Sequence, residues 1–433
     1  MNRSIRNGAA LKGRSLLIRL ALSVAVVGGL LVTGPSPASS QSTSLGRWIP
    51  LPSMTEARQH PASVLMANGR VLVSGGRSET AALLSAEVLD PLTLRWTPTG
   101  LMATGRWRHT ATALPDGRVL VAGGFANPYG VSATGAGLNA QPVTNTAEIY
   151  DPATSSWTPT GPMNVRRALH AASILDNGKV LVAGGRTCAS PPPTACDFSN
   201  RTNSAELWDP ETGTWTLIAP MNVDRHTTSA AKLADGRVLI PAGFTAAGNG
   251  INGDIYNPAT GTWSLTGPLT DSRARQGAAL LPDGRVLVMA GFPNRQTSEV
   301  YNPQSNQWQL SGLVNFTGRF NFYFATLPDG RVLLTGGQVP ATGLARSSEL
   351  WSPGQGWVRG PDMVNAHGTS SSLGNSEEAI VLSGDPDRYV YDAQKCANRC
   401  GMVLVIGNSP TGVVDAYLPN CTPALNTVRY ACV

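Results

Sequence analysis

The stretch from Asp116 to Gly124, Asp-Gly-Arg-Val-Leu-Val-Ala-Gly-Gly, is the feature that most constrains this chain of 433 residues. A polar turn runs into a short apolar strand, which a glycine pair ends. A single copy would be an ordinary turn and strand. The pattern returns, however, in residues 68–76, 177–185, 235–243, 283–291 and 329–337. Recurrence at a spacing of tens of residues predicts an architecture built from repeated units.

Each repeat has four parts in a fixed order. An Arg precedes a small or apolar strand, and the turn and apolar strand come next. After a loop of variable length, an acidic residue opens a strand that ends at Pro, as in Glu148 to Pro152, and a strand with a Trp, such as Trp157, closes the unit. Four short strands between Gly, Pro, Asp and Asn turns predict one four-stranded antiparallel sheet per repeat. Repeated sheets of this size close radially into a β-propeller, whose core is the packing between blades.

The order Arg, Gly-Gly, Glu-x-Tyr-Asp-Pro and Trp resembles the kelch repeat, although Ala242 and Ala290 replace the first glycine in two copies. The resemblance covers most of the chain after residue 40 and implies an all-β, kelch-type β-propeller of six or seven blades. We predict seven. Residues 48–50 form an outer strand without partners, and three strands without a Trp come after Trp357, at 369–373, 379–382 and 389–392. Together they predict a closing blade made from both ends of the chain, with six blades as the alternative.

Residues 1–40 have the features of a secretory signal peptide. A basic region precedes an apolar core from Leu20 to Val32, and small residues come after it, which predicts cleavage before Gln41. An uncleaved membrane anchor is the alternative, for which the apolar run is short. The predicted location is therefore secreted, periplasmic or extracellular. Five of the 33 Lys and Arg and none of the 27 Asp and Glu lie in this segment, so the formal net charge of +6 is mostly removed with it. The remaining charge indicates neither a nucleic-acid nor a membrane partner.

All six Cys lie after the predicted cleavage site, and an even number in an exported chain favours disulfides. Cys188 and Cys196 are expected to close the loop between them. The other four lie in residues 393–433, which we assign to a separate cap or hairpin after a propeller at 41–392; they are Cys396, Cys400, Cys421 and Cys432. Three pairings are open for these four. A zinc site is the rival, but no two-residue Cys spacing and no nearby His support it.

Features that every blade has indicate scaffold, whereas features that only some blades have indicate function. The turn between the first two strands lies on one face of a propeller, and the long loops lie on the other, here called the loop face. The repeated Arg and the repeated acid both open strands on the loop face. They are Arg58, Arg106, Arg167, Arg225, Arg273 and Arg319 with Glu87, Glu148, Glu206, Asp254, Glu299 and Glu349. Ion pairs that fix the blade are one interpretation, and a channel mouth lined with Arg for an anionic ligand is the other.

The irregular residues give the candidate site. The five His all lie near the start of a first strand, and strand alternation would place His226 on the same side as His109 and His170. Such a cluster could bind a metal or move protons, or it could pack beneath the loops. Phe125 and Phe244 come directly after the second glycine of their repeats, and rings there could stack on sugars or peptide side chains, or plug the channel. Two long loops, after Gly124 and Gly185, lie on neighbouring blades and could form a binding rim or be neutral insertions.

The sequence lacks a nucleophile elbow, a P-loop and a dinucleotide fingerprint, so we assign no catalytic residue, metal ligand or cofactor. We predict an exported, monomeric binding module for a protein or carbohydrate, acting through the loop face. The alternative is a carbohydrate-processing enzyme similar to the sialic-acid mutarotases or to the galactose-oxidase-like copper enzymes, which share the kelch propeller. The predicted ligand-binding residues are Arg106, Trp107, Arg108, His109, Phe125, Arg166, Arg167, His170, Arg186, His226 and Phe244.

Overall fold

The computed structural model describes residues 45–78, 81–126, 142–187, 200–293, 295–315, 318–339, 343–367, 377–378, 380–382, 402–406, 412–419, 421–423 and 430–432. The described residues all belong to one compact unit, Ser44–Val433. The predicted signal peptide and the Cys188–Cys196 loop therefore lie outside the described residues. In the described part the chain forms strands and turns but no helix, and so no helix there is long and apolar enough to cross a membrane.

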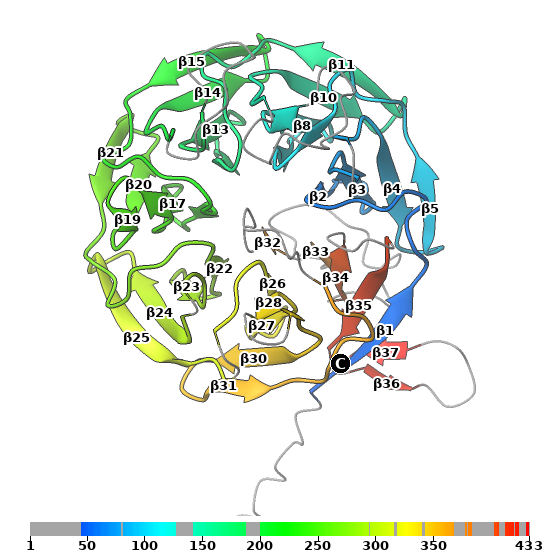
Figure 1. Ribbon diagram of the computed structural model, residues 1–433, viewed down its shortest axis with the longest axis vertical. Coiled ribbons are helices and arrows are strands. Elements are labelled where there is room, and N and C mark those ends of the chain that lie inside the picture. Colours follow the sequence, from blue (N-terminus) through cyan, green and yellow to red (C-terminus); the bar gives the residue numbers. More distant parts are fainter. Residues whose placement is uncertain are drawn as a thin grey trace, which may run out of the picture. The chain divides into compact units, whose positions relative to one another are not determined.

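Seven four-stranded antiparallel blades lie around a central axis in the Ser44–Val433 unit (Figure 1). The all-β propeller and the number of seven blades are both confirmed. The first blade consists of β2 (Ala62–Leu65), β3 (Val71–Ser74), β4 (Ala86–Asp90) and β5 (Arg95–Pro98). The second consists of β7 (Thr110–Ala113), β8 (Val119–Ala122), β10 (Ala147–Asp151) and β11 (Ser156–Thr160). The third consists of β12 (Ala171–Ile174), β13 (Val180–Ala183), β14 (Ala205–Asp209) and β15 (Thr214–Ile218).

The next three blades repeat this order from the axis outward. The fourth consists of β16 (Ala231–Lys232), β17 (Val238–Ile240), β20 (Asp254–Asn257) and β21 (Thr262–Leu265). The fifth consists of β22 (Gly277–Leu280), β23 (Val286–Met289), β24 (Thr297–Asn302) and β25 (Gln307–Leu313). The sixth consists of β26 (Tyr323–Thr326), β27 (Val332–Thr335), β30 (Ser348–Ser352) and β31 (Gly356–Arg359), and the short β32 (Glu377–Glu378) pairs in parallel with β26.

Short two-stranded ribbons add to these blades. They are β6 (Arg106–Trp107) with β9 (Phe125–Ala126), β18 (Phe244–Thr245) with β19 (Gly248–Asn249), and β28 (Gln338–Val339) with β29 (Gly343–Leu344). Each ribbon includes the residues directly after the second glycine of its repeat, and in the second blade it joins them to the repeated Arg and the residue after it.

The closing blade joins the two ends of the chain, as expected, but its strands differ from the predicted ones. From the axis outward it consists of β33 (Ile380–Leu382), β34 (Met402–Ile406), β35 (Val414–Leu418) and β1 (Arg47–Leu51). Residues 380–382 therefore form the first strand, where we expected the second, and the expected strands at 369–373 and 389–392 lie outside the described residues.

The assignment of all of residues 393–433 to a cap is thus wrong for β34 and β35. The run Met402–Ile406 is buried at every position, like the second strands of the other blades, and this is why it pairs inside the sheet. After β35 the chain forms a hairpin of β36 (Cys421–Pro423) and β37 (Tyr430–Cys432), whose register places the backbone of Cys421 opposite that of Cys432.

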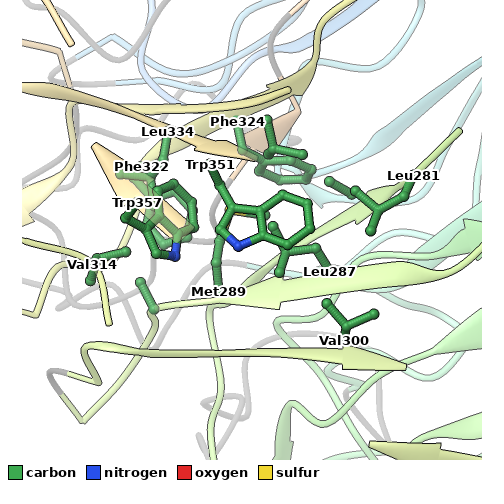
Figure 2. Packing of buried hydrophobic residues seen from close by; sticks show 13 residues of the cluster. Leu281, Leu287, Met289, Val300, Val314, Phe322, Phe324, Leu334, Trp351 and Trp357 are labelled. Carbon is green, nitrogen blue, oxygen red and sulfur yellow. The ribbon is translucent and has the colours of Figure 1, made fainter. Parts of the chain in front are cut away.

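The hydrophobic core lies between neighbouring blades. Figure 2 shows the contact between the fifth and sixth blades, where Leu287 and Met289 of β23 pack with Phe322, Leu334 and the two Trp of the sixth blade. Similar clusters join the other blades. Burial of apolar surface between sheets, rather than within any one sheet, therefore holds the ring together.

Candidate functional site

The six repeated Arg form buried ion pairs with the repeated acids of their own blades. Arg167 illustrates the arrangement: its Nη2 lies 2.7 Å from Glu206 Oε1, and its Nη1 donates to the carbonyls of Gly184 and Ser204 at 2.8 and 3.1 Å. Burial lowers the pKa of Arg167, and Glu206 opposes that shift. The other pairs are Arg58–Glu87, Arg106–Glu148, Arg225–Asp254, Arg273–Glu299 and Arg319–Glu349.

This geometry favours the scaffold interpretation over the channel mouth. The side chains of Arg106 and Arg167 are 0% exposed, so a ligand on the surface cannot reach them. We therefore remove both from the predicted binding residues. Their buried donors join the ends of three strands in one blade, which is a structural role.

The glycine pairs are explained by the contact between blades. The N–H of Gly124 donates to the carbonyl of Arg167 in the next blade at 2.9 Å. Gly123 has φ +66°, and a Cβ there would lie 2.4 Å from the Arg167 carbonyl oxygen. A side chain is thus excluded by both the backbone conformation and the neighbouring blade.

A series of backbone hydrogen bonds, here called the ring, runs from the first blade to the fifth just beyond these glycines. It joins the second residues after the repeated Arg of these blades, and each of them has a positive φ. The links include Arg108 N to His60 O, Leu169 N to Arg108 O, Thr227 N to Leu169 O and Arg275 N to Thr227 O, all at 3.0–3.2 Å. A left-handed conformation is costly for residues other than Gly. The ring fixes the backbone from which the candidate site projects.

The candidate site, which we call the mouth, is built from this ring and from a set of paired residues beside it. The residue after each repeated Arg pairs across to the residue directly after the second glycine of its repeat. The pairs are Gln59 with Arg77, Trp107 with Phe125, Ala168 with Arg186, His226 with Phe244, Ala274 with Phe292, and Phe320 with Gln338. The same backbone positions thus carry different side chains in different blades, which is the asymmetry expected of a binding surface.

In the first two blades the mouth combines cationic and aromatic groups. The guanidinium of Arg77 lies 5.3 Å from the Trp107 ring centroid, and the His60 ring stacks on the same Trp107 at 5.7 Å. His60 Nε2 lies 3.1 Å from Arg108 Nη2. Burial, then the charges of Arg108 and Arg77, lower the pKa of His60 well below its ordinary value. His60 is therefore neutral, and the positive charge here belongs to arginine.

In the third and fourth blades the pattern repeats with His226 and Phe244, whose rings lie 5.4 Å apart. Burial, followed by the charges of Arg186, Arg201 and Arg275 in that order of importance, lowers the pKa of His226 to about 3. Three guanidinium groups thus act on one imidazole, which makes this part of the mouth electropositive.

The fifth blade contributes a guanidinium surrounded by rings. Arg275 lies over Phe244, Phe292 and Phe320, with distances of 5.3, 5.3 and 5.2 Å to their centroids. These rings come from the fourth, fifth and sixth blades. Burial lowers the pKa of Arg275 to about 10, so it still carries its charge at neutral pH. The aromatic side chains hold the cation in place and line the same half of the mouth.

His109 and His170 lie elsewhere. Each packs between two blades: His109 Nε2 is 3.0 Å from Ser74 Oγ, and His170 Nε2 is 3.0 Å from Thr110 Oγ1. Both rings are buried beneath the glycine pair of the preceding blade. The predicted grouping with His226 is wrong because Thr227, at φ 60°, interrupts strand alternation.

Six of the predicted residues therefore gather at the mouth; they are Trp107, Arg108, Phe125, Arg186, His226 and Phe244. Trp107 and Phe125 are each 1% exposed, so they support the mouth from beneath and do not meet a ligand. Arg166 is exposed and donates to the Val143 carbonyl at 3.4 Å, which holds it against the segment that precedes β10 of the second blade. The prediction missed five mouth residues: His60, Arg77, Arg275, Phe292 and Phe320. Each of the five lies at the same distance from its turn Gly as a predicted mouth residue of another blade, and this signal could have found them.

Within the described ranges, no three His, Cys, Asp or Glu side chains lie close enough to one another to hold a metal ion. The predicted disulfides and their rival, a tail zinc site, fall at least partly on residues outside those ranges, so the disulfides stay a prediction and the zinc site its alternative.

Comparison with known proteins supports the fold class. The geometry defines this protein as a seven-bladed β-propeller built from a repeated four-stranded blade. Residues 106–164 and 167–222 each match a model described as the kelch motif. The chain is thus a seven-bladed β-propeller that contains kelch motifs.

Among curated proteins, Kelch-like protein 28 of Mus musculus is 33% identical over 100 residues, covering 23% of this chain and 17% of the relative. The F-box/kelch-repeat protein SKIP30 of Arabidopsis thaliana is 33% identical over 91 residues, covering 21% and 23%. The similarity thus spans less than a quarter of either relative.

Among solved structures, that of YjhT has a TM-score of 0.55 at 17% identity, covering 71% of this chain and 99% of that one. A fungal alcohol oxidase of the AA5 family, in complex with copper, has a TM-score of 0.65 at 15% identity, covering 90% and 79%. At these identities the likeness shows the fold alone, and it brings no copper ligand to this chain.

Proposed function

We propose that this protein is a binding module that is exported and takes an anionic ligand at the mouth on its loop face. The observation that carries the proposal is the arrangement of guanidinium and aromatic groups around a ring of backbone hydrogen bonds. Arg77, Phe244 and Phe292 are partly exposed and form the surface that a ligand meets first. Arg108, Arg186 and Arg275 lie behind them and contribute charge.

The charge of the mouth supports an anionic ligand. His60 and His226 are neutral, so their rings add no positive charge and serve as flat packing surfaces. Of the acids near this face, Asp224 lies 3.1 Å from Arg201 and Asp271 lies 3.7 Å from Arg295. The guanidinium groups of the mouth therefore outweigh the acids among the residues that the structure describes, and an anion gains from that potential.

The rigid scaffold supports binding rather than a moving catalytic loop. The ion pairs and the ring of backbone bonds fix the mouth before a ligand arrives, which lowers the entropy cost of binding. A carboxylate offers two oxygens to a guanidinium, and the apolar face of a sugar or a peptide side chain can lie on Phe244 and Phe292. Both an acidic carbohydrate and an acidic protein segment meet these requirements.

The test measures binding of the purified mature protein to two probes, polygalacturonate and an oligoglutamate peptide, with dextran as the neutral control. We expect one acidic probe to bind, with an affinity that falls as salt rises. The variant Arg77→Gln should weaken it by about tenfold, equivalent to about 1.4 kcal/mol.

The matched control is Arg118→Gln, an arginine of the opposite face that is paired with Asp116. It should bind like the unaltered protein. Equal binding of dextran, or loss of binding in Arg118→Gln but not in Arg77→Gln, would contradict the proposal. The probe that binds decides between the carbohydrate and the protein ligand.

A further inference from the structure

The position directly after the second glycine of each repeat differs in exposure from blade to blade. At this position Phe125 of the second blade and Arg186 of the third are only 1% and 3% exposed. In the first, fourth, fifth and sixth blades the side chain is partly exposed, and these residues are Arg77, Phe244, Phe292 and Gln338. A ligand can therefore reach this position in the first blade and again in the fourth to sixth blades.

On the side of the first blade, Arg77 is held in place for an anion. Its Nε and Nη2 donate to Gln59 Oε1 at 3.3 and 3.2 Å, and its guanidinium lies over the ring of Trp107. Among the residues that the structure describes, no carboxylate forms an ion pair with Arg77, and burial alone lowers its pKa. Arg201, which is also partly exposed, is by contrast paired with Asp224 at 3.1 Å. A planar guanidinium that is fixed in this way suits one carboxylate of a ligand.

On the side of the fourth and fifth blades, two rings form an apolar surface. Phe244 and Phe292 are both partly exposed, and their ring centroids lie 5.6 Å apart at an interplanar angle of 49°. The guanidinium of Arg275 lies 5.3 Å from each centroid. A sugar unit can place its C–H face on such rings, and the charge of Arg275 beside them attracts an acidic group of the same unit.

These two sides of the mouth are well separated. The first and fourth blades lie on opposite sides of the propeller axis (Figure 1). Along the arc of the mouth from Arg77 to Phe244, four further side chains stand in succession, which are Trp107, Phe125, Arg186 and His226. The successive distances are 5.3, 4.6 and 6.0 Å as far as Arg186, and 5.4 Å from His226 to Phe244. A ligand that meets both sides therefore has several units rather than one.

We propose that the ligand is an oligomer of uronic acid units that crosses the mouth from Arg77 to Phe244 and Phe292. This inference rests on the proposed function and names its ligand class. Each uronic acid unit combines one carboxylate with a flat C–H face, and the two sides of the mouth offer a guanidinium and a pair of rings. The carboxylates of an acidic peptide stand on flexible stems that lose more conformational freedom on binding, so the chemistry favours the carbohydrate.

The test is calorimetric titration of the full mature protein with galacturonic acid and with its linear oligomers of two to six units. We expect the hexamer to bind at least about tenfold more tightly than the single unit, after correction for the number of binding frames, because its second contact is intramolecular. Arg77→Gln and Phe244→Leu should each weaken the hexamer by about tenfold, and the single unit should respond to no more than one of them. Phe292→Leu is a second change on the side of the rings, and melting temperatures establish that each variant is folded.

Two ligand controls separate the chemistry. Hexaglutamate has the carboxylates without the ring faces, and maltohexaose has the ring faces without the carboxylates, so both should bind more weakly than the galacturonate hexamer. Equal affinity for one unit and for six, or a hexamer that is insensitive to Arg77→Gln or to both changes of Phe, overturns the inference but leaves an anion-binding mouth. Tighter binding of hexaglutamate overturns it too and assigns the mouth to an acidic protein segment. If no acidic probe binds, the proposed function fails together with the inference.

Discussion

Replacing Glu206 by Gln tests whether the repeated ion pairs are structural. Glu206 accepts hydrogen bonds from the backbone N–H of Asn164 and Val165 at 2.7 and 3.0 Å, and from Arg167. The Gln amide keeps the shape but presents an NH2 group where an acceptor is needed. It also leaves the guanidinium of Arg167, which is 0% exposed, without a counter-charge.

The expected cost is set by that burial. Removing one partner of a buried pair typically costs about 3–5 kcal/mol. For the unit Ser44–Val433, the usual entropy of unfolding per residue gives about 0.8 kcal/mol per kelvin, so the melting temperature should fall by about 4–6 °C. Calorimetry with a check of reversibility, and denaturant unfolding, measure both quantities.

The control is Asp116→Asn. Asp116 lies 2.6 Å from Arg118, but both side chains are at least 40% exposed, and such pairs contribute about 0–1 kcal/mol. A double variant, Glu206→Gln with Arg167→Met, removes both charges and should cost less than the sum of the two single changes. If Glu206→Gln is as mild as Asp116→Asn, or if the two single effects simply add, the reasoning about buried charge is refuted.

Three further outcomes are expected. Burial would raise the pKa of Asp415, but a hydrogen bond from His367 and bonds from the preceding loop outweigh it and lower the pKa. The stability that Asp415 contributes is therefore full above about pH 4 and is lost as the pH falls through the pKa of the folded state. Asp415→Asn should thus flatten an acid titration of unfolding that is followed by Trp fluorescence. Gly123→Ala should destabilise the fold more than Gly261→Ala, because both glycines have positive φ but only a Cβ at Gly123 would lie 2.4 Å from a carbonyl oxygen. The left-handed conformation alone costs about 1–2 kcal/mol in either variant, and the midpoints of denaturant unfolding compare the two. N-terminal sequencing of the exported protein should begin at Gln41, and a start at residue 1 would contradict a cleaved signal peptide.

The sequence predicted the symmetric part of the fold well because repetition supplies its own alignment. Six copies measured from the turn Gly located the ion pairs and the strands of six blades, and Trp48 located the outer strand of the seventh. The other strands of the closing blade lack the turn motif and the glycine pair, so nothing in the sequence set their register. A buried strand, Met402–Ile406, was therefore assigned to a cap.

The site was harder to predict because side-chain direction depends on one backbone angle. Alternation would have placed His226 with His109 and His170, but the next residue, Thr227, has a positive φ and reverses the direction. The same conformation at Arg275 turns its guanidinium toward three rings from three blades. Positive φ at a residue other than Gly is set here by bonds between blades, which a single repeat does not reveal.

The closing blade shows which member of the repeated ion pair is common to all seven blades. His367 takes the place of the Arg, since its carbonyl accepts the Gly337 N–H at 2.8 Å, and its Nε2 lies 3.3 Å from Asp415. Asp415 in turn accepts the Asn365 N–H at 2.7 Å, as the acids of the six other blades accept a backbone N–H from the preceding loop. The basic residue varies, whereas the acid and its backbone donor occur in all seven blades. The acid therefore has the general role of anchoring the loop that enters each blade, and in six blades an Arg balances its buried charge.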